Sequence, residues 1–253
     1  MTADGLIGWS FSAMLLSLRV APVFAFAPPF TLVRMPRTSR MLMSLGIAAC
    51  IVAANPAAAA LAHTGAGAIL TAAARELMLG LIFMIAFQLS YAGLQFAGRT
   101  VDIQAGFGLS TLIDPTTHAS MPLVGTLFVY ATGAVFFAMD GHAELLRTLA
   151  ASLDAVPLGA YQLQETPAAL IGYISLVFLT AFGVAGGAML ALFLCDLSIA
   201  MLSRTVPQMN VLVLGFQVKT IVLLLVLPLT FGTAGALLAR MSRITLESLP
   251  GLI

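Results

Sequence analysis

The chain has 253 residues, of which 60% are hydrophobic and only 8% are charged, and its mean hydropathy is +1.06. An ordinary soluble domain has about 25% charged residues, so this composition excludes a typical soluble fold, whose surface it could not cover with polar side chains. The net charge of +1 supplies no basic field for a nucleic acid. We therefore expect an integral protein of the lipid bilayer with no nucleic-acid partner.

Six windows of the sequence are long and apolar enough, or nearly so, to form membrane helices. A bilayer core takes about 20 mostly apolar residues of helix, and the sequence lacks the short alternating segments of a membrane barrel. Backbone in hydrocarbon must pair its hydrogen bonds internally, so we predict an all-α, polytopic fold in a single domain, residues 1–253. The windows cover residues 6–30, 41–62, 69–97, 123–139, 167–195 and 211–239.

The first window contains residues that disturb a helix. Arg19, Pro22, Pro28 and Pro29 interrupt its apolar run, and proline removes a hydrogen bond from a helix interior, so we expect a kinked or broken helix. The stretch 25–27 resembles a signal-peptide cleavage site, but the N-terminus lacks the basic residues that a signal peptide needs. We therefore expect the first helix to be retained.

The connection from Gly98 to Met121 is unusually apolar for a solvated loop. Gly106 and Gly108 give it a pliable backbone, and Asp114-Pro115 is a turn signal. Its large apolar side chains need burial, which is typical of a re-entrant packing loop. These side chains are Phe107, Leu109, Leu112 and Ile113.

A second connection, residues 140–166, contains an amphipathic stretch at 144–153. Its leucines recur at helical spacing, so one face of the predicted helix is apolar. Such a helix fits a membrane interface or the surface of a partner. The leucines are Leu145, Leu146, Leu149 and Leu153.

Charged residues in or near the apolar windows have two possible roles. Such charges are expensive and often line a proton or substrate path, but they also form structural pairs. The sequence has no run of acidic residues that would make a relay, so we favour structural pairing, or exposure to the water-filled interior of an assembly. The residues are Arg19, Arg75, Glu76, Asp196, Arg204 and Lys219.

The sequence carries no pattern of an enzyme or of a metal or cofactor site. His63, His118 and His142 are far apart, and none is followed four residues later by a carboxylate or a second histidine, as in a metal-binding helix. We therefore expect no catalytic residues, no metal and no cofactor.

Several strings of the sequence resemble the FliR/SctT family of type III secretion export-gate proteins. The strongest has the pattern R-x-x-P-Q-x-N-x-x-x-x-G-F-x-x-K, a second begins at Asp140-Gly141-His142, and a third is Gln104–Gly108 with Asp114-Pro115. The chain also matches the family at 19–36 and 76–80, so the strings spread over nearly the whole chain in the family's order. The first pattern consists of Arg204, Pro207, Gln208, Asn210, Gly215, Phe216 and Lys219.

This resemblance implies a helical export-gate subunit made of hairpins, at the flagellar basal body in the bacterial inner membrane. The expected partners are FliP-like and FliQ-like subunits, with FlhB-like and FlhA-like proteins nearby. Unfolded flagellar proteins would pass through the shared channel. The family's plug, which blocks the closed pore, matches Gly106, Phe107, Gly108, Leu109, Leu112, Ile113, Asp114 and Pro115.

Three other functions stay open on the sequence alone. A subunit of an injectisome would have the same pattern, although the strings at 207–219 and 140–159 favour a flagellar system. A small-molecule or ion transporter would show two related halves with paired broken helices, and we find no such halves. The third is a passive membrane scaffold, which copurification with other gate subunits would distinguish from a gate.

Overall fold

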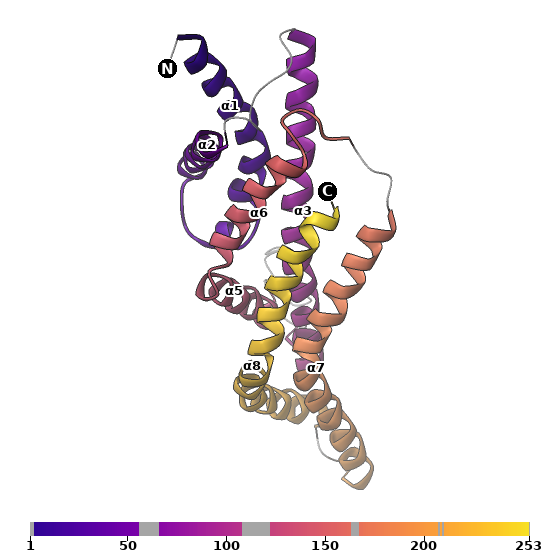
Figure 1. Ribbon diagram of the computed structural model, residues 1–253. Helices are drawn as coiled ribbons and strands as arrows, with labels where there is room; N and C mark the ends of the chain where they lie inside the picture. Colours follow the sequence, from indigo (N-terminus) through magenta and orange to yellow (C-terminus); the bar gives the residue numbers. More distant parts are fainter. Residues whose placement is uncertain are drawn as a thin grey trace. The chain divides into compact units, whose positions relative to one another are not determined.

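The computed structural model describes residues 3–55, 66–107, 122–162, 167–206, 208 and 210–252. The regular structure in these ranges is helical, which confirms the predicted all-α class (Figure 1). The elements are α1 (Ala3–Phe26), the short 3-10 helix η1 (Phe30–Leu32), α2 (Arg37–Ala54), α3 (Ala66–Ala105), α5 (Leu123–Ala138), α6 (Gly141–Ala155), α7 (Pro167–Thr205) and α8 (Val211–Leu252).

Five of the described helices are long and apolar enough to cross a membrane. The pair α5 and α6 adds a sixth if the two are taken as one span, bent by 71°. Helix α3 has 40 residues, whereas about 20 residues cross a bilayer core. The number of spans agrees with the predicted polytopic fold, but α3, α7 and α8 continue well beyond the predicted windows.

The first window is broken, as expected, at Pro28-Pro29, whereas helix α1 continues through Arg19 and Pro22. The helix runs through both residues and ends at Phe26, just before Pro28-Pro29 and the short helix η1. A proline inside a helix removes one hydrogen bond, but α1 stays regular because neighbouring helices fix it, as its contacts with α2 and its buried side chains show.

The chain divides into two compact units. Unit 1 contains residues 1–89, 136–173 and 243–253, and unit 2 contains residues 90–135 and 174–242. Helices α3, α5, α7 and α8 each contribute to both units. The predicted single domain remains a prediction.

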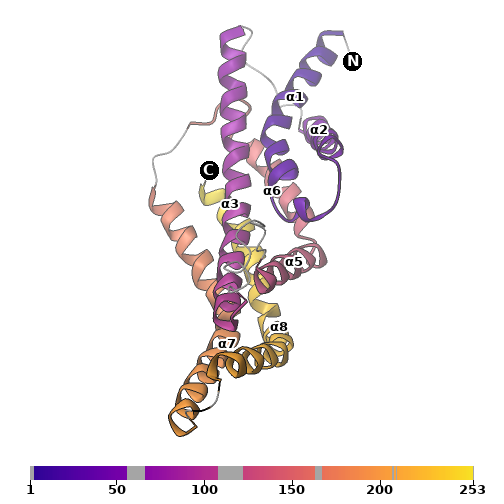
Figure 2. The same ribbon diagram turned by 180° about the vertical axis from the view of Figure 1, so that it is seen from behind.

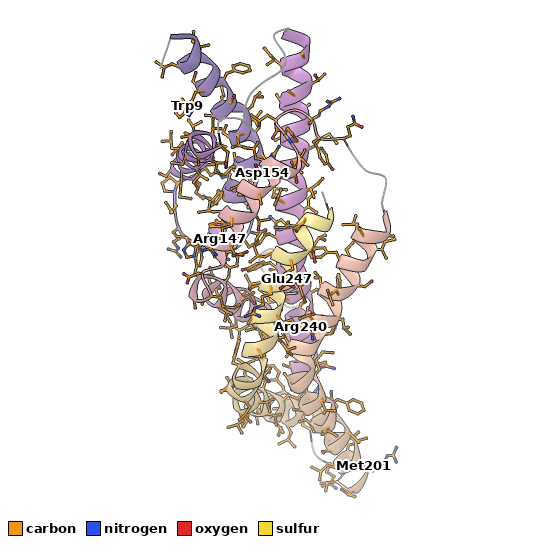
Figure 3. The ribbon with its side chains drawn as sticks, in the orientation of Figure 1. Trp9, Arg147, Asp154, Met201, Arg240 and Glu247 are labelled. Carbon is orange, nitrogen blue, oxygen red and sulfur yellow. The ribbon has the colours of Figure 1, made fainter. Side chains whose placement is uncertain are left out.

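Unit 1 buries the apolar face of α6. Leu145, Leu149 and Leu153 are fully buried, while Arg147 and Asp154 on the same helix are exposed and are marked in Figure 3. This confirms the predicted amphipathic helix. Its apolar face is buried within the chain's own fold, and the two views in Figures 1 and 2 show the helix alongside α1 and α3.

Aromatic rings fill the other end of unit 1. The Phe30 ring of η1 lies 4.4 Å from the Phe24 ring and 6.2 Å from the Phe136 ring, centre to centre, and Phe136 in turn lies 5.8 Å from Phe87. Rings at these distances in tilted or edge-to-face geometry each contribute about 0.5–1.5 kcal/mol beyond their burial. The cluster therefore ties the end of α1 and η1 to α3 and to the end of α5.

In unit 2, α3 and α5 touch through two glycines. A Cβ at Gly98 would lie 2.2 Å from the Cα of Gly125, so the two backbones are too close for any side chain at this point. Small residues permit this kind of helix contact in membranes. The contact fixes α5 against the final turns of α3.

We predict that Gly98→Ala prevents unit 2 from packing. The added methyl must push α5 away from α3. The control is Gly186→Ala, where a Cβ meets nothing within 4 Å. This control should gain about 1 kcal/mol of stability, because alanine has the higher helix propensity. Thermal melting of the detergent-purified protein measures the difference. Equal melting temperatures for the two variants would show that the contact between Gly98 and Gly125 does not constrain the fold.

Candidate functional site

The predicted plug begins at the end of α3. Gly106 and Phe107 are the last residues described before the connection, and α5 resumes the described chain after Pro122. The remaining predicted plug residues lie outside the described part of the chain: Gly108, Leu109, Leu112, Ile113, Asp114 and Pro115. The structure therefore describes the two segments that flank this connection, namely the end of α3 with Gly106 and Phe107, and the start of α5. We call them the α3 stem and the α5 stem.

Asp102 joins the two stems. Its carboxylate, 4% exposed, accepts the backbone N–H of Val124 with both oxygens at 3.1 Å, and Val124 lies in the first turn of α5. Its backbone carbonyl accepts the N–H of Phe107 at 3.0 Å. A carboxylate at a helix N-terminus is favoured by the free amides and the helix dipole, and a hydrogen bond to a charged group contributes about 1.5–3 kcal/mol.

A second contact holds the α3 stem to α8. The rings of Phe107 and Phe216 lie 6.3 Å apart at 75°, an edge-to-face pair of a kind that contributes about 0.5–1.5 kcal/mol. Gly106 has φ +91°, which favours glycine, and a Cβ there would also lie 3.0 Å from the Phe216 ring. The backbone therefore favours glycine at this position, and a side chain there would press on the Phe216 ring.

An ion pair joins α7 to α8 close to this ring. The Lys219 ammonium contacts the Asp196 carboxylate, and a Cβ at Gly215 would lie 3.8 Å from Ile199, so the first turns of α8 lie directly on α7. Asp196 and Lys219 therefore form an ion pair, as the favoured interpretation of these charges expects. Arg204 lies in the last turn of α7, where a cation suits the helix dipole.

Asn210 lies in the turn between α7 and α8. Its side-chain oxygen accepts the backbone N–H of Val213 at 3.3 Å, so Asn210 caps the N-terminus of α8. Both Gln208 and Asn210 are exposed in this chain. Pro207 lies outside the described residues.

The string at Asp140 forms the corner between α5 and α6. Asp140 adopts a left-handed backbone with φ +55°, which aspartate tolerates better than most residues. Gly141 is buried, and a Cβ there would lie 2.6 Å from the Phe136 ring, while the His142 ring lies 5.9 Å from the Phe137 ring. These three residues therefore shape the turn between α5 and α6 in this structure.

A buried ion pair organises unit 1. The Arg19 guanidinium on α1 donates to both Glu76 carboxylate oxygens on α3, at 2.7 and 2.9 Å, and both side chains are fully buried. Gly80, one helical turn after Glu76, admits the α1 backbone, because a Cβ there would lie 2.6 Å from the Arg19 carbonyl oxygen. The pair confirms structural pairing for these two charges.

The remaining donors and acceptors of the pair reach α6 and the turn after it. Arg19 also donates to the Ser152 carbonyl and hydroxyl oxygens and to the Val156 carbonyl, each at 3.0 Å. Glu76 accepts the Gly159 N–H at 2.8 Å, and Arg75 donates to the Gly159 carbonyl at 2.9 Å. A buried charge is tolerated only when it is paired and hydrogen-bonded in this way.

Sequence reasoning missed Asp102 and the partners of Arg19. Asp102 is a polar residue inside the long apolar helix α3, which is the signal the sequence offers for it. Ser152 lies in the amphipathic helix α6, 133 residues after Arg19, and nothing in the local sequence links the two. Within the described ranges, no three His, Cys, Asp or Glu side chains gather as a metal site. The hydrogen bonds of Asp102 to Val124 and Phe107 fix the two ends of the connection between α3 and α5.

The family model and the related proteins found by comparison all belong to bacterial protein export. The family model for bacterial export proteins, family 1, matches residues 10–244. Flagellar biosynthetic protein FliR of Bacillus subtilis is 27% identical over 184 residues, which is 71% of each chain. That of Escherichia coli is 26% identical over 57% of this chain and 56% of its own. Yop proteins translocation protein T of Yersinia pestis is 26% identical over 60% of each chain.

We predict that Glu76→Gln sharply reduces the amount of folded protein. The variant keeps the shape of the side chain but leaves the Arg19 charge buried without its counter-ion, which costs about 3–5 kcal/mol. The control is Glu144→Gln, which breaks an exposed pair with Arg147 and should change stability by less than about 1 kcal/mol. Melting temperature and yield after membrane extraction measure both.

A double variant distinguishes the cost of an unpaired buried charge from the cost of changing the volume of the side chains. Arg19→Met combined with Glu76→Leu removes both charges, so it should recover part of the stability that Glu76→Gln loses. The recovery is partial because the Val156 carbonyl and the Gly159 N–H lose their partners. A double variant less stable than Glu76→Gln would contradict the proposed cost of the unpaired charge.

Proposed function

Because the chain belongs to the bacterial export proteins, family 1, we propose that it is an export-gate subunit of a flagellar type III protein secretion apparatus. The observation that carries this function is the family match, which extends over residues 10–244. The flagellar names among its relatives favour the flagellum over an injectisome. The aligned part covers only 56% of the Escherichia coli relative, so its complete activity is transferred here as a proposal.

The chain is a membrane protein of several helices, and its outer surface suits an apolar environment. Helices α7 and α8 expose many large apolar side chains, which need lipid or the apolar faces of other subunits. Examples are Leu190, Phe193, Leu194, Leu197, Ile221, Leu224, Leu225 and Leu229. Within the apparatus we infer FliP-like and FliQ-like subunits as neighbours, FlhB-like and FlhA-like proteins close by, and the basal body in the bacterial inner membrane as the location.

The proposed role in the gate is scaffolding and closure, without covalent catalysis. The connection at 106–115 would plug the closed channel, and unfolded flagellar proteins would pass when it moves. Two observations support this proposal: the connection is rich in large apolar residues, which resist water in a narrow constriction, and Asp102 holds its two stems together. Because the end of α3 and the start of α5 are joined in this way, we expect both ends of the connection to move together.

We expect that deleting the gene abolishes export of flagellar proteins. Cells would neither swim nor release flagellar subunits into the medium, and the wild-type gene would restore both. If deletion instead stops secretion of injectisome substrates and leaves swimming intact, the flagellar assignment is wrong. Copurification of FliP-like and FliQ-like proteins with the tagged chain tests the inferred neighbours in the same strains.

We expect that the double variant Phe107→Ser and Leu109→Ser, or removal of residues 106–113, leaves the gate assembled but permeable to ions. Serine favours water in an apolar constriction, so dewetting no longer blocks conduction. Membrane potential and growth measure the leak, and native gels measure assembly. The control is Thr116→Ser with Thr117→Ser in the same connection. Normal assembly without a leak would show that this connection is structural packing.

A further inference from the structure

Three arginines lie at the start of α2, and no acidic side chain neutralises them. Arg34 lies two residues before Pro36, the N-cap of α2, and Arg37 and Arg40 belong to the first turn of the helix. The sequence has no aspartate or glutamate from residue 5 to residue 75. Within the described ranges, none of the three arginines forms an ion pair. This part of unit 1 therefore has a positive charge that the chain leaves uncompensated.

Arg40 is buried although its charge has no counter-ion. The residue is only 8% exposed and belongs to the buried face of α2, which lies beside α1 in Figures 1 and 2. Its Nη1 donates to the Ala25 carbonyl at 2.8 Å, whereas its buried Nε has no hydrogen-bond partner among the described residues. The buried Arg19 of the same unit is neutralised by Glu76. A buried charge needs such a partner, so an anion from outside the chain is missing at Arg40.

The first turn of α2 presents free N–H groups beside these charges. Pro36 supplies no side-chain cap, and the first turn has no acidic residue. The amides of Arg37, Thr38 and Ser39 consequently have no acceptor in the described part of the chain. Helical side chains tilt toward the N-terminus, so the Arg40 side chain lies over this same turn. Free amides, the helix dipole and guanidinium groups together favour an anion with several oxygens, such as a phosphate.

The next turns of α2 are apolar and exposed on the side of Arg37. Arg37, Met41 and Leu45 are all exposed, and because they recur every four residues they lie in one row along the helix. Helix α2 is also long and apolar enough to cross a membrane. Arginines at the end of a membrane helix lie at the level of the lipid headgroups. A free phosphate ion would neutralise the arginines but leave the row uncovered, whereas a phospholipid would do both.

We propose that the start of α2 is a binding site for an anionic phospholipid. The phosphate accepts hydrogen bonds from Arg34, Arg37 and the free amides of the first turn, and the Arg40 charge lies behind it. An acyl chain lies along Met41 and Leu45. Three uncompensated arginines select a headgroup with a net negative charge over a zwitterionic one, because each basic residue near an anionic lipid adds attraction. The site is independent of the proposed gate function and requires only that the chain lies in a membrane.

The test uses the full-length chain in a neutral detergent, together with any subunits that copurify. Native mass spectrometry measures the binding of phosphatidylglycerol and of phosphatidylcholine, which share a phosphodiester but differ in net charge. The main variant is Arg34→Gln with Arg37→Gln, which leaves the core intact because both side chains are exposed. The matched control is Arg99→Gln with Arg240→Gln, which removes two exposed arginines from unit 2; Figure 3 labels Arg240.

We expect the main variant to bind phosphatidylglycerol about 25-fold more weakly than the wild type, which corresponds to about fivefold for each arginine. Its binding of phosphatidylcholine should not change, and the control should bind both lipids as the wild type does. Arg40→Gln removes the buried charge, so it should also lose the preference for phosphatidylglycerol. If this variant fails to fold, the main variant still decides, since it changes exposed residues alone.

Three results would overturn the proposal. Equal binding of the two lipids by the wild type, or an equal loss in the main variant and the control, would show a general attraction of anionic lipid to the protein without a site. Displacement of the lipid by inorganic phosphate at a similar concentration would show that the arginines bind a free anion. If the main variant keeps its lipid but loses a copurifying subunit, the arginines bind an acidic side chain of that partner.

Discussion

The fold of unit 1 depends on a single requirement: the fully buried Arg19 charge must be neutralised and its donors must all be satisfied. Glu76 supplies the counter-ion from α3, and Ser152 and Val156 supply acceptors from α6 and the chain after it. A guanidinium has a planar set of donors with fixed directions, so it constrains the rotation and the height of each partner helix. Apolar packing alone would allow α1, α3 and α6 to slide, since methyl groups have no preferred direction.

In unit 2, single polar contacts also fix the positions of apolar helices. Asp102 binds the start of α5, Asp196 binds Lys219, and Asn210 caps α8. Each contact places one polar side chain at the point where an apolar helix must meet another element in a defined register. In a chain with few charged residues, these contacts specify the arrangement, whereas the apolar surface supplies most of the cohesion.

The sequence predicts the helices of this protein well and their partners poorly. Hydropathy located the windows because lipid-facing and core residues are both apolar, but it ended the third window at residue 97, whereas α3 continues through Arg99 and Asp102 to Ala105. Helical hydrogen bonds are local and continue through polar residues when these find partners, as Asp102 does. Such partners cannot be read from spacing: Arg19 binds Ser152 across 133 residues. The plug is predicted from the family resemblance alone, since neither periodicity nor composition indicates it.

The separation of Arg19 from its acceptors has a consequence for biogenesis. During synthesis Arg19 emerges 57 residues before Glu76 and 133 residues before Ser152, which at roughly 5–20 residues per second is about 3–11 s and 7–27 s respectively. For that interval α1 carries a cation that hydrocarbon tolerates poorly. The Arg19 charge therefore gains its counter-ion only after α3 has been made, and its remaining acceptors only after α6 and the turn that follows it. The final burial of the first helix thus depends on segments that are translated well after it.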